Sequence, residues 1–264
     1  MFTRLRSLID HLISTDIGNR GVQRLYFILK KTRANYLEKS TEILLSSKTV
    51  LIVSDFPIPP MMIPETDGPP GALALALALD ELGKRAVILT QDIIAEGLRR
   101  FYRRVITDFP KEQFSCIVSI ETPGRAKDGK YYSFSGMEIK VRRYDELFIN
   151  AKVPTIGIGD GGNEIGMGNL NLEGKYYSTV KTTELIVAGV SNWGAYGLVA
   201  GLSIKTGQNL LRDYEEAEVV KTLVEAGAID GITKRREVSV DGLPMSIHSK
   251  MLGLIKEIIK LRVH

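Results

Sequence analysis

A glycine-rich acidic stretch at residues 156–169 is the part of the chain best suited to chemistry. An apolar run of the β type ends at Asp160, and Asn163 and Glu164 follow among several glycines. Glycine allows the backbone to adopt positive φ and to lie close to a ligand. The two carboxylates and the carboxamide can bind a hard cation or hold the polar groups of a small substrate. A plain turn needs fewer glycines, so we interpret this stretch as a functional loop.

Five short apolar runs, one of them leading into that loop, are candidates for buried strands. Such runs are typical of strands covered on both faces, as in a parallel sheet. Helix-type segments separate them, so we predict an α/β fold with a mostly parallel, doubly wound sheet flanked by helices in three layers. The candidates are Val50–Val53, Ala86–Thr90, Cys116–Ile120, Thr155–Ile158 and Leu185–Val190.

Residues 71–82 have an ambiguous pattern, because alanine and leucine alternate as in a strand. Both residue types are strong helix formers, however. Pro69 and Pro70 suit the first turn of a helix, and Gly83 suits the position just after its end. We therefore predict a helix with little polar surface, packed into the core.

Helical spacing of apolar residues also dominates both ends of the chain, over the first 48 residues and again over 215–225 and 245–261. Repeats and low-complexity linkers are absent from the sequence. We predict a single domain, residues 1–264, with N-terminal and C-terminal helical extensions. Its parts are a helical extension (1–48), an α/β core (49–205) and a C-terminal helical part (206–264).

Polar clusters follow four of the predicted strands, at residues 54–71, 121–131, 159–168 and 191–194. In an open α/β sheet, ligands bind beyond the carboxyl ends of the strands. Four such clusters at the same end of the sheet are a pattern that plain turns rarely produce. We expect these loops to meet around one shared cavity.

Composition limits the classes of partner. The formal net charge is +4, but the basic residues are scattered, and the densest groups, such as residues 234–236, lack aromatic neighbours and a known nucleic-acid motif. The single cysteine, Cys116, excludes an internal disulfide and fits a reducing compartment. No apolar run approaches the roughly 18 residues of a membrane span. We predict a cytoplasmic protein with a small-molecule partner, without nucleic acid or membrane, and we leave homo-oligomerisation open.

Several familiar chemistries can be set aside. The Gly68–Gly71 segment contains two prolines, which lack the N–H donors of a phosphate-binding loop, so no nucleotide cofactor is expected. Too few cysteines and histidines are present for a zinc site with Cys and His ligands. A metal would be a hard ion such as Mg²⁺ or Mn²⁺ on carboxylates. His248 remains open, either as a general acid or base or as a helix-surface or capping residue.

The motifs together resemble the C-terminal domain of the D-glutamate cyclase family. The resemblance covers nearly the whole chain, in order, and implies a lyase that converts D-glutamate, or a related amino acid, to 5-oxo-D-proline with loss of water. The motifs that carry it are Gly18–Gly21, Glu65–Gly71, Gly124–Ala126 with Asp128-Gly129 and Tyr131-Tyr132, Gly159–Gly168, Ala188–Gly194 and Asp241–Pro244.

Lactam formation requires a deprotonated amine, a neutralised carboxyl group and an acid for the departing oxygen. We assign the metal or proton-transfer centre to Asp160 and Glu164 with Asp67 or Glu65 opposite, and the metal ligands to Asp160, Glu164 and Asp67. Arg20 and Arg125 are candidates to hold the substrate α-carboxylate. Asn163 and Asn192 are candidates to orient the amine. His248 is a further catalytic candidate, and the remaining predicted substrate contacts are Asn19, Thr66, Gly68, Asp128, Tyr131, Gly161, Gly162, Ser191 and Trp193.

Two other functions compete with this assignment. The 159–164 loop also resembles the magnesium-binding motif of haloacid-dehalogenase-like phosphatases, with Asp55 as the nucleophile. Proline at position 57 stands where those enzymes have their acid, which weighs against this function. The other alternative is a non-catalytic domain or subunit that binds an amino acid. Binding and catalysis use largely the same residues, so the sequence discriminates poorly between them.

Overall fold

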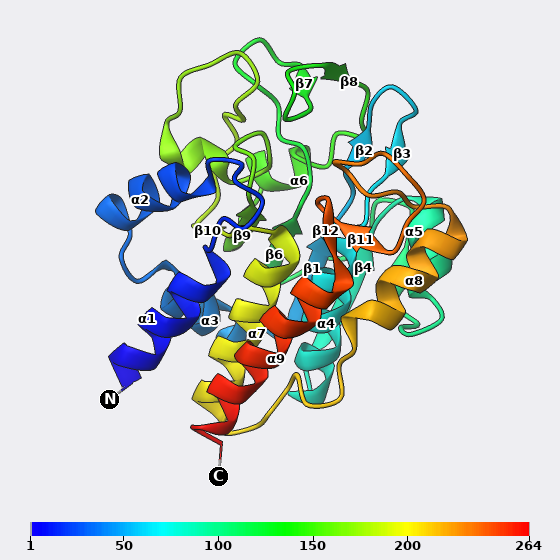
Figure 1. Ribbon diagram of the computed structural model, residues 1–264. Coiled ribbons are helices and arrows are strands. Elements are labelled where there is room, and N and C mark those ends of the chain that lie inside the picture. The colour runs from blue at the N-terminus through cyan, green and yellow to red at the C-terminus, as the bar shows by residue number, and fades with distance from the viewer. Residues whose placement is uncertain (1, 264) are drawn as a thin grey trace.

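The computed structural model describes residues 2–263 and is built around a six-stranded parallel sheet (Figure 1). Every pair of neighbouring strands runs in the same direction. The α/β fold predicted from the sequence is confirmed. In spatial order the strands are β10 (Glu184–Val187), β9 (Thr155–Gly159), β6 (Cys116–Ile120), β1 (Thr49–Val53), β4 (Arg85–Leu89) and β5 (Val105–Ile106).

Side chains alternate between the two faces of the central strand. Val50 and Ile52 of β1 pack into the main hydrophobic core, whereas Leu51 and Val53 pack into a second cluster on the opposite face. Because both faces are buried, the strand is apolar throughout, which is the feature that made it recognisable. Strand β5 escaped prediction because it has only two residues, too few for any periodicity.

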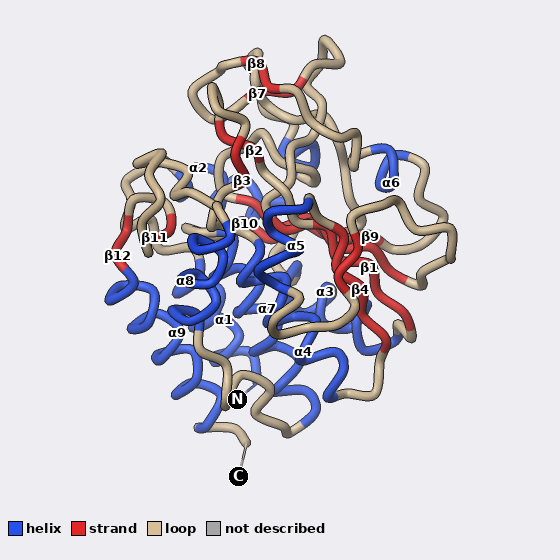
Figure 2. The backbone as a smooth tube through the Cα atoms, turned by 90° about the vertical axis from the view of Figure 1, so that its right-hand side faces the viewer, coloured by secondary structure: helices blue, strands red, loops and turns tan. Residues whose placement is uncertain are grey.

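Helices gather mainly on one side of the sheet, where α1, α3, α4, α7 and α9 enclose the main core (Figures 1 and 2). The other side is covered by the short helix α6 and by long loops that contribute Phe114 and Tyr144. The helices are α1 (Phe2–Ile13), α2 (Val22–Thr32), α3 (Tyr36–Ser46), α4 (Pro69–Glu81), α5 (Asp92–Leu98), α6 (Glu146–Ile149), α7 (Ser191–Thr206), α8 (Glu216–Ala226) and α9 (Met245–Lys260), with a 3₁₀ turn at Met167–Leu170.

Helix α4 confirms the helix predicted for the alanine–leucine repeat. It begins at Pro69, the first of two consecutive prolines, and its leucines and alanines are buried on almost every side. Its nearest neighbour is α7, and Gly71 permits the close approach. A Cβ atom at Gly71 would lie 2.8 Å from Ala195 Cβ and 3.2 Å from Asn192 Cα. The two helices therefore begin side by side at the edge of the sheet where its strands end.

The order of the strands creates a crevice at that edge. The chain passes from β1 outward to β4 and β5, then returns to β6 and continues outward through β9 and β10. The loops after β1 and β6 therefore diverge, which is the place where open α/β sheets bind ligands. Three small hairpins lie nearby, as Figure 1 shows at the top of the molecule for the first two. They are β2 (Pro57–Ile58) with β3 (Ile63–Pro64), β7 (Tyr131–Tyr132) with β8 (Glu138–Ile139), and β11 (Ser239–Val240) with β12 (Leu243–Pro244).

Within residues 2–263, no helix combines the length and the apolar character needed to cross a lipid bilayer.

Candidate active site

A cavity of about 210 Å³ lies at the crevice, and five of its lining residues are acidic. Apolar and small residues from the hairpins and neighbouring loops make up much of the rest. The acidic lining residues are Glu65, Glu121, Asp160, Glu164 and Asp241; the remaining ones are Arg20, Phe56, Ile58, Pro59, Ser133, Phe134, Ser135, Gly161, Asn163, Gly231, Ile232 and Lys234. Loops far apart in the sequence thus meet around one hollow, as predicted for those at 54–71, 121–131 and 159–168, whereas residues 191–194 do not line it.

The glycine-rich loop after β9 folds around its own glutamate. The Glu164 carboxylate accepts hydrogen bonds from the backbone N–H groups of Gly161 at 2.6 Å and Gly162 at 2.8 Å. Gly162 has φ of 95°, a conformation that favours glycine. Asn163 donates its amide N–H to the Tyr132 carbonyl at 2.9 Å, and its buried Oδ1 has no hydrogen-bond partner among the described residues. A residue of the cavity lining therefore carries a buried acceptor that is not used within the protein.

Arg20 reaches this site from the turn between α1 and α2. Its Nη2 donates to Asp241 Oδ2 at 2.7 Å, to the Gly189 carbonyl at 2.9 Å and to Asp160 Oδ2. Asp16 holds the turn by accepting the backbone N–H of Arg20 at 2.8 Å. A guanidinium is charged at any physiological pH, so it offsets part of the acidity at the centre of the cluster.

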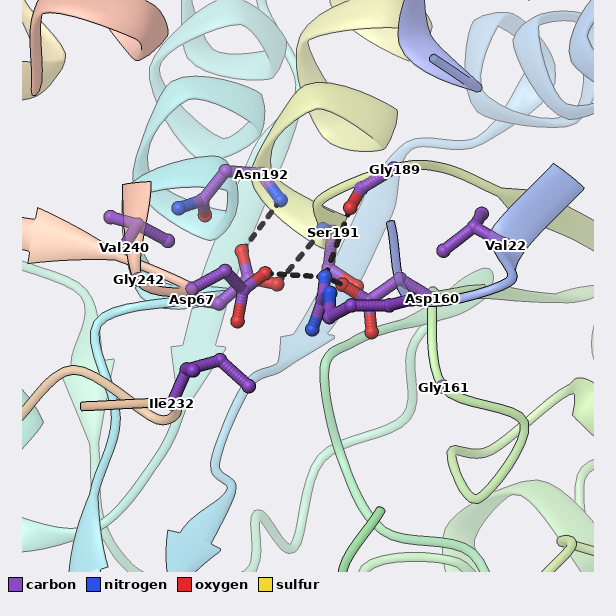
Figure 3. A network of polar contacts seen from close by, with 12 residues as sticks. Val22, Asp67, Asp160, Gly161, Gly189, Ser191, Asn192, Ile232, Val240 and Gly242 are labelled. Atoms are coloured by element: carbon purple, nitrogen blue, oxygen red, sulfur yellow. Dashed lines mark hydrogen bonds and ion pairs between the residues drawn. The ribbon is translucent and has the colours of Figure 1, made fainter. Parts of the chain in front are cut away.

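Asp67 and Asn192 bind the starts of two helices reciprocally, and Figure 3 shows the contacts of Asp67. Asp67 accepts the backbone N–H groups of Ser191 and Asn192, each at 2.9 Å, at the start of α7. The Asn192 side chain in turn accepts the N–H groups of Gly68 at 3.0 Å and Gly71 at 2.9 Å, at the start of α4. Both helices thereby direct their positive ends toward the acidic cluster.

Sequence reasoning missed two acidic residues that line the cavity, Glu121 and Asp241. Glu121 directly follows β6 at the point where the strand order reverses, and the Ser191 hydroxyl donates to it at 2.5 Å. It has φ of 46°, unusual for a residue with a side chain, which is typical of functional positions. That signal is visible only in a structure. Asp241 lies in an Asp-Gly turn late in the chain, and nothing in its local sequence connects it to Arg20.

Burial dominates the electrostatics of the cluster. It raises the pKa of Glu65, Asp67, Glu121 and Asp160 well above their usual values, and neighbouring carboxylates raise them further. Arg20 opposes this effect and lowers the pKa of Asp160. The pKa of Glu164 also rises through burial, against its backbone hydrogen bonds. Burial and mutual repulsion therefore favour the protonated forms of these carboxyl groups, whereas Arg20 favours the ionised form of Asp160.

Two groups of three carboxylates have ligand atoms within 4.8 Å of one another, close enough to share a metal ion. One is Asp67 with Asp160 and Asp241, and the other is Asp160 with Glu121 and Glu164. Arg20 already pairs with two members of the first group, and Asp67 does not line the cavity. All members of the second group line it, so this group fits a metal that would also contact a ligand.

Residues 122–131, which follow Glu121 after β6, do not line the cavity. Arg125 forms a two-point ion pair with the buried Asp145, with Nε–Oδ2 at 2.5 Å and Nη2–Oδ1 at 3.1 Å. The Tyr131 hydroxyl donates to the same carboxylate at 2.7 Å. Asp128 is exposed and accepts the Tyr132 hydroxyl at 2.6 Å. These contacts hold the loop itself, and the substrate-binding roles predicted for Arg125, Asp128 and Tyr131 have no support in this geometry.

His248 and Trp193 are also away from the cavity lining. Trp193 donates its indole N–H to His248 Nδ1 at 3.1 Å, so that nitrogen is the acceptor and Nε2 carries the hydrogen toward the Val240 carbonyl at 3.1 Å. Burial lowers the pKa of His248, which favours this neutral form. With both nitrogens engaged and the ring fully buried, the catalytic role predicted for His248 has no support in this geometry.

Three other predicted substrate contacts lie outside the cavity lining. Thr66 donates its hydroxyl to the Ser239 carbonyl at 2.8 Å, which joins the loop before α4 to the hairpin β11–β12. Gly68 has φ of 98° and faces Ser54 and Glu121 so closely that a Cβ atom would clash. Asn19 is exposed in the turn that carries Arg20.

Asp55, the nucleophile required by the phosphatase alternative, does not line the cavity. It is buried, accepts a hydrogen bond from the Gln91 side chain, and burial raises its pKa to about 6. The geometry therefore gives no support to that function.

Fold and site together define a parallel α/β protein with a buried acidic cavity at the switch point of its sheet. Residues 9–256 match the family described as D-glutamate cyclase-like, C-terminal, and the chain belongs to this family. It is 27% identical to human mitochondrial D-glutamate cyclase over 328 aligned positions, which cover 97% of this chain and 52% of the human protein. The chain thus spans about half the length of that curated relative.

Solved structures resemble the fold more distantly. An exopolyphosphatase-related protein from Bacteroides fragilis is 13% identical, with a TM-score of 0.42 over 88% of this chain and 60% of that protein. The exonuclease RecJ from Thermus thermophilus, solved with Mn²⁺, is also 13% identical, with a TM-score of 0.36 over 87% of this chain and 35% of RecJ.

Proposed function

We propose that the protein is a D-glutamate cyclase-like lyase that converts D-glutamate to 5-oxo-D-proline and water. The observation that carries the proposal is the cluster of buried carboxyl groups lining one small cavity, in a chain of this family. The name of the human relative supports the choice of substrate. It also places that enzyme in mitochondria, so the cytoplasmic location of this chain stays a prediction.

The reaction has a proton balance that suits such a cluster. The substrate ammonium loses two protons as its nitrogen bonds to the γ-carbon, and the departing carboxyl oxygen gains two and leaves as water. No proton is gained or lost overall. Carboxyl groups that are protonated and ionised side by side can accept protons from the nitrogen and return them to the oxygen.

Residue roles follow from position. Asp160 and Glu121, whose carboxylate oxygens lie within 4.8 Å of each other, are proposed to take part in proton transfer, together with Glu65 in the same cavity lining. The free Oδ1 of Asn163 is proposed to accept a hydrogen bond from the substrate amine. Arg20 supplies positive charge where the γ-carboxylate must approach the acids.

A divalent cation fits the same place. Glu121, Asp160 and Glu164 would hold it, because all three line the cavity and oxygen ligands suit Mg²⁺ or Mn²⁺. When bound, such an ion would neutralise the γ-carboxylate and make it a better electrophile.

Proton NMR of the purified protein with D- and L-glutamate tests the proposal, with and without Mn²⁺ and with a chelator. We expect lactam signals from the D isomer only, and a reduced rate with chelator if the cation takes part. Absence of lactam under all conditions would contradict the proposal. The alternative, a binding domain or subunit, predicts thermal stabilisation by D-glutamate without turnover.

A further inference from the structure

Two cationic side chains line the cavity within residues 8–263, and only one is engaged. Arg20 donates hydrogen bonds from its Nη2 to Asp160, Asp241 and the Gly189 carbonyl. Lys234 is exposed and makes no side-chain hydrogen bond or ion pair with any described residue. The cavity therefore has an acidic interior and one unpaired positive charge in its lining.

The backbone of Lys234 is fixed in an unusual conformation. Its φ is 59°, in the left-handed region, and its N–H donates to the Asp230 carbonyl at 2.9 Å. The Asp230 carboxylate accepts the N–H groups of Ile232 at 2.9 Å, Thr233 at 2.8 Å and Gly242 at 2.8 Å. Such a conformation costs free energy in a residue with a side chain, and it persists where the surrounding contacts determine it. The loop thus holds the backbone of Lys234 at a defined place on the cavity wall, from which its unpaired side chain extends.

The substrate of the proposed reaction has a matching distribution of charge. Its amine and γ-carboxyl group react, and the amine must approach the acids. Its α-carboxylate takes no part in bond formation and would be repelled by the acidic interior. An exposed lysine offers this group a cation where it keeps much of its hydration, so little is lost by desolvation.

We propose that Lys234 binds the non-reacting α-carboxylate of the substrate and thereby selects α-amino dicarboxylic acids. This inference rests on the proposed function and adds to it a residue that recognises the substrate. Residues 234–236 are a basic group that the sequence presents only as a solvated surface. The structure separates Lys234 from its two neighbours, because Lys234 alone of the three lines the cavity.

The test compares two substrates that differ only at the α-carboxylate. D-Glutamate and its α-amide, D-isoglutamine, can both form a lactam through the same amine and γ-carboxyl group. In Lys234→Met we expect kcat/KM for D-glutamate to fall about tenfold, mainly through KM, while kcat/KM for the α-amide stays within about threefold. Lys234→Arg should recover much of the selectivity. Arg235→Met is the matched control, since it is exposed in the same loop but does not line the cavity.

Equal losses on both substrates, or no loss on either, would overturn the role of Lys234 while leaving the proposed function intact. If the wild-type protein cyclises neither compound, the proposed function fails and calorimetry decides the inference. Tighter binding of D-glutamate than of the α-amide, lost in Lys234→Met, would uphold it. Absence of any such difference in binding would refute it. Thermal unfolding of each variant checks that the fold is intact.

Discussion

Two buried groups of titratable side chains can be compared in this protein. The first is the acidic cluster of the cavity, Glu65, Asp67, Glu121, Asp160, Glu164 and Asp241. The second, which we call the sealed group, lies between α7, α8 and α9 and consists of Tyr196, Tyr214, Glu216 and His248, with Trp193 bonded to His248. Both are almost fully buried. The acidic cluster has backbone N–H donors, two helix starts and Arg20 to support negative charge.

Glu216 of the sealed group lies at the start of α8, but its carboxylate accepts no backbone N–H among the described residues. No lysine or arginine pairs with Glu216 among the described residues, and its nearest basic atom is His248 Nδ1, 3.8 Å from Oε1. Burial raises the pKa of Glu216 to about 8, and the Tyr196 hydroxyl offsets only part of this effect. Burial of acids alone therefore does not indicate a catalytic site. Donors that stabilise the charged form, together with an open cavity, distinguish the first group from the second.

Neutralising one acid in each group tests most directly whether only the cavity acids take part in the reaction. Asp160→Asn removes a carboxyl group from the cavity, and we expect cyclisation to slow by roughly 10³-fold. Glu216→Gln is the control and should leave the rate within about threefold. Rates come from NMR, with circular dichroism to confirm folding. A similar loss in both variants would mean that the acids act through the fold and not through the reaction.

Two arginines allow the same comparison for positive charge. Arg20→Met leaves Asp160 and Asp241 without their cation, and we expect a loss of about 3 kcal/mol in the free energy of unfolding and a roughly 10²-fold slower reaction. Arg125→Met breaks the pair with buried Asp145 outside the cavity, so it should destabilise the protein but change kcat/KM little. Urea unfolding and steady-state kinetics measure both effects. A large kinetic effect at Arg125 would restore the substrate-binding role that its sequence predicted.

A smaller change tests the shape of the acidic wall. A methyl group at Gly231 would clash with the Glu65 carboxylate, so Gly231→Ala must displace that side chain. We expect about a tenfold fall in kcat/KM with little change in thermal stability. Gly253→Ala on α9 meets nothing within 4 Å and serves as the control. Unchanged kinetics in Gly231→Ala would remove Glu65 from the proposed machinery.

The last effect concerns the sealed group and appears in stability alone, without a change in the reaction rate. The folded-state pKa of Glu216 is raised, so its contribution to stability is fully present below the unfolded value near 4.5 and is lost as the pH rises toward about 8. Between these limits the wild type should lose on the order of 4 kcal/mol relative to Glu216→Gln. Denaturant unfolding of the two proteins from pH 4.5 to 9 measures the difference. A constant difference across this range would contradict the raised pKa.

The sequence predicted those parts of the molecule that leave a local pattern. Central strands are recognisable because both of their faces are buried, and α4 because proline and glycine bound a run of good helix formers. The 159–164 loop was recognisable because its conformation needs glycine. Partnerships between distant residues leave no such pattern. Arg125 forms an ion pair with Asp145 outside the cavity, and Arg20 binds Asp241, which is 221 positions away in the sequence. Neither ion pair could be predicted from the sequence.

The reciprocal bonds between Asp67 and Asn192 have a mechanical consequence. They bind the first turns of α4 and α7 to each other, so the two helix starts next to the cavity form one rigid unit, which we call the clasp. Any adjustment of this protein around a guest molecule must then come from the rim, where Phe134 and Ile232 project from hairpin and loop segments. Tightening or loosening those two loops should therefore alter how quickly molecules enter and leave, with the clasp below them unchanged.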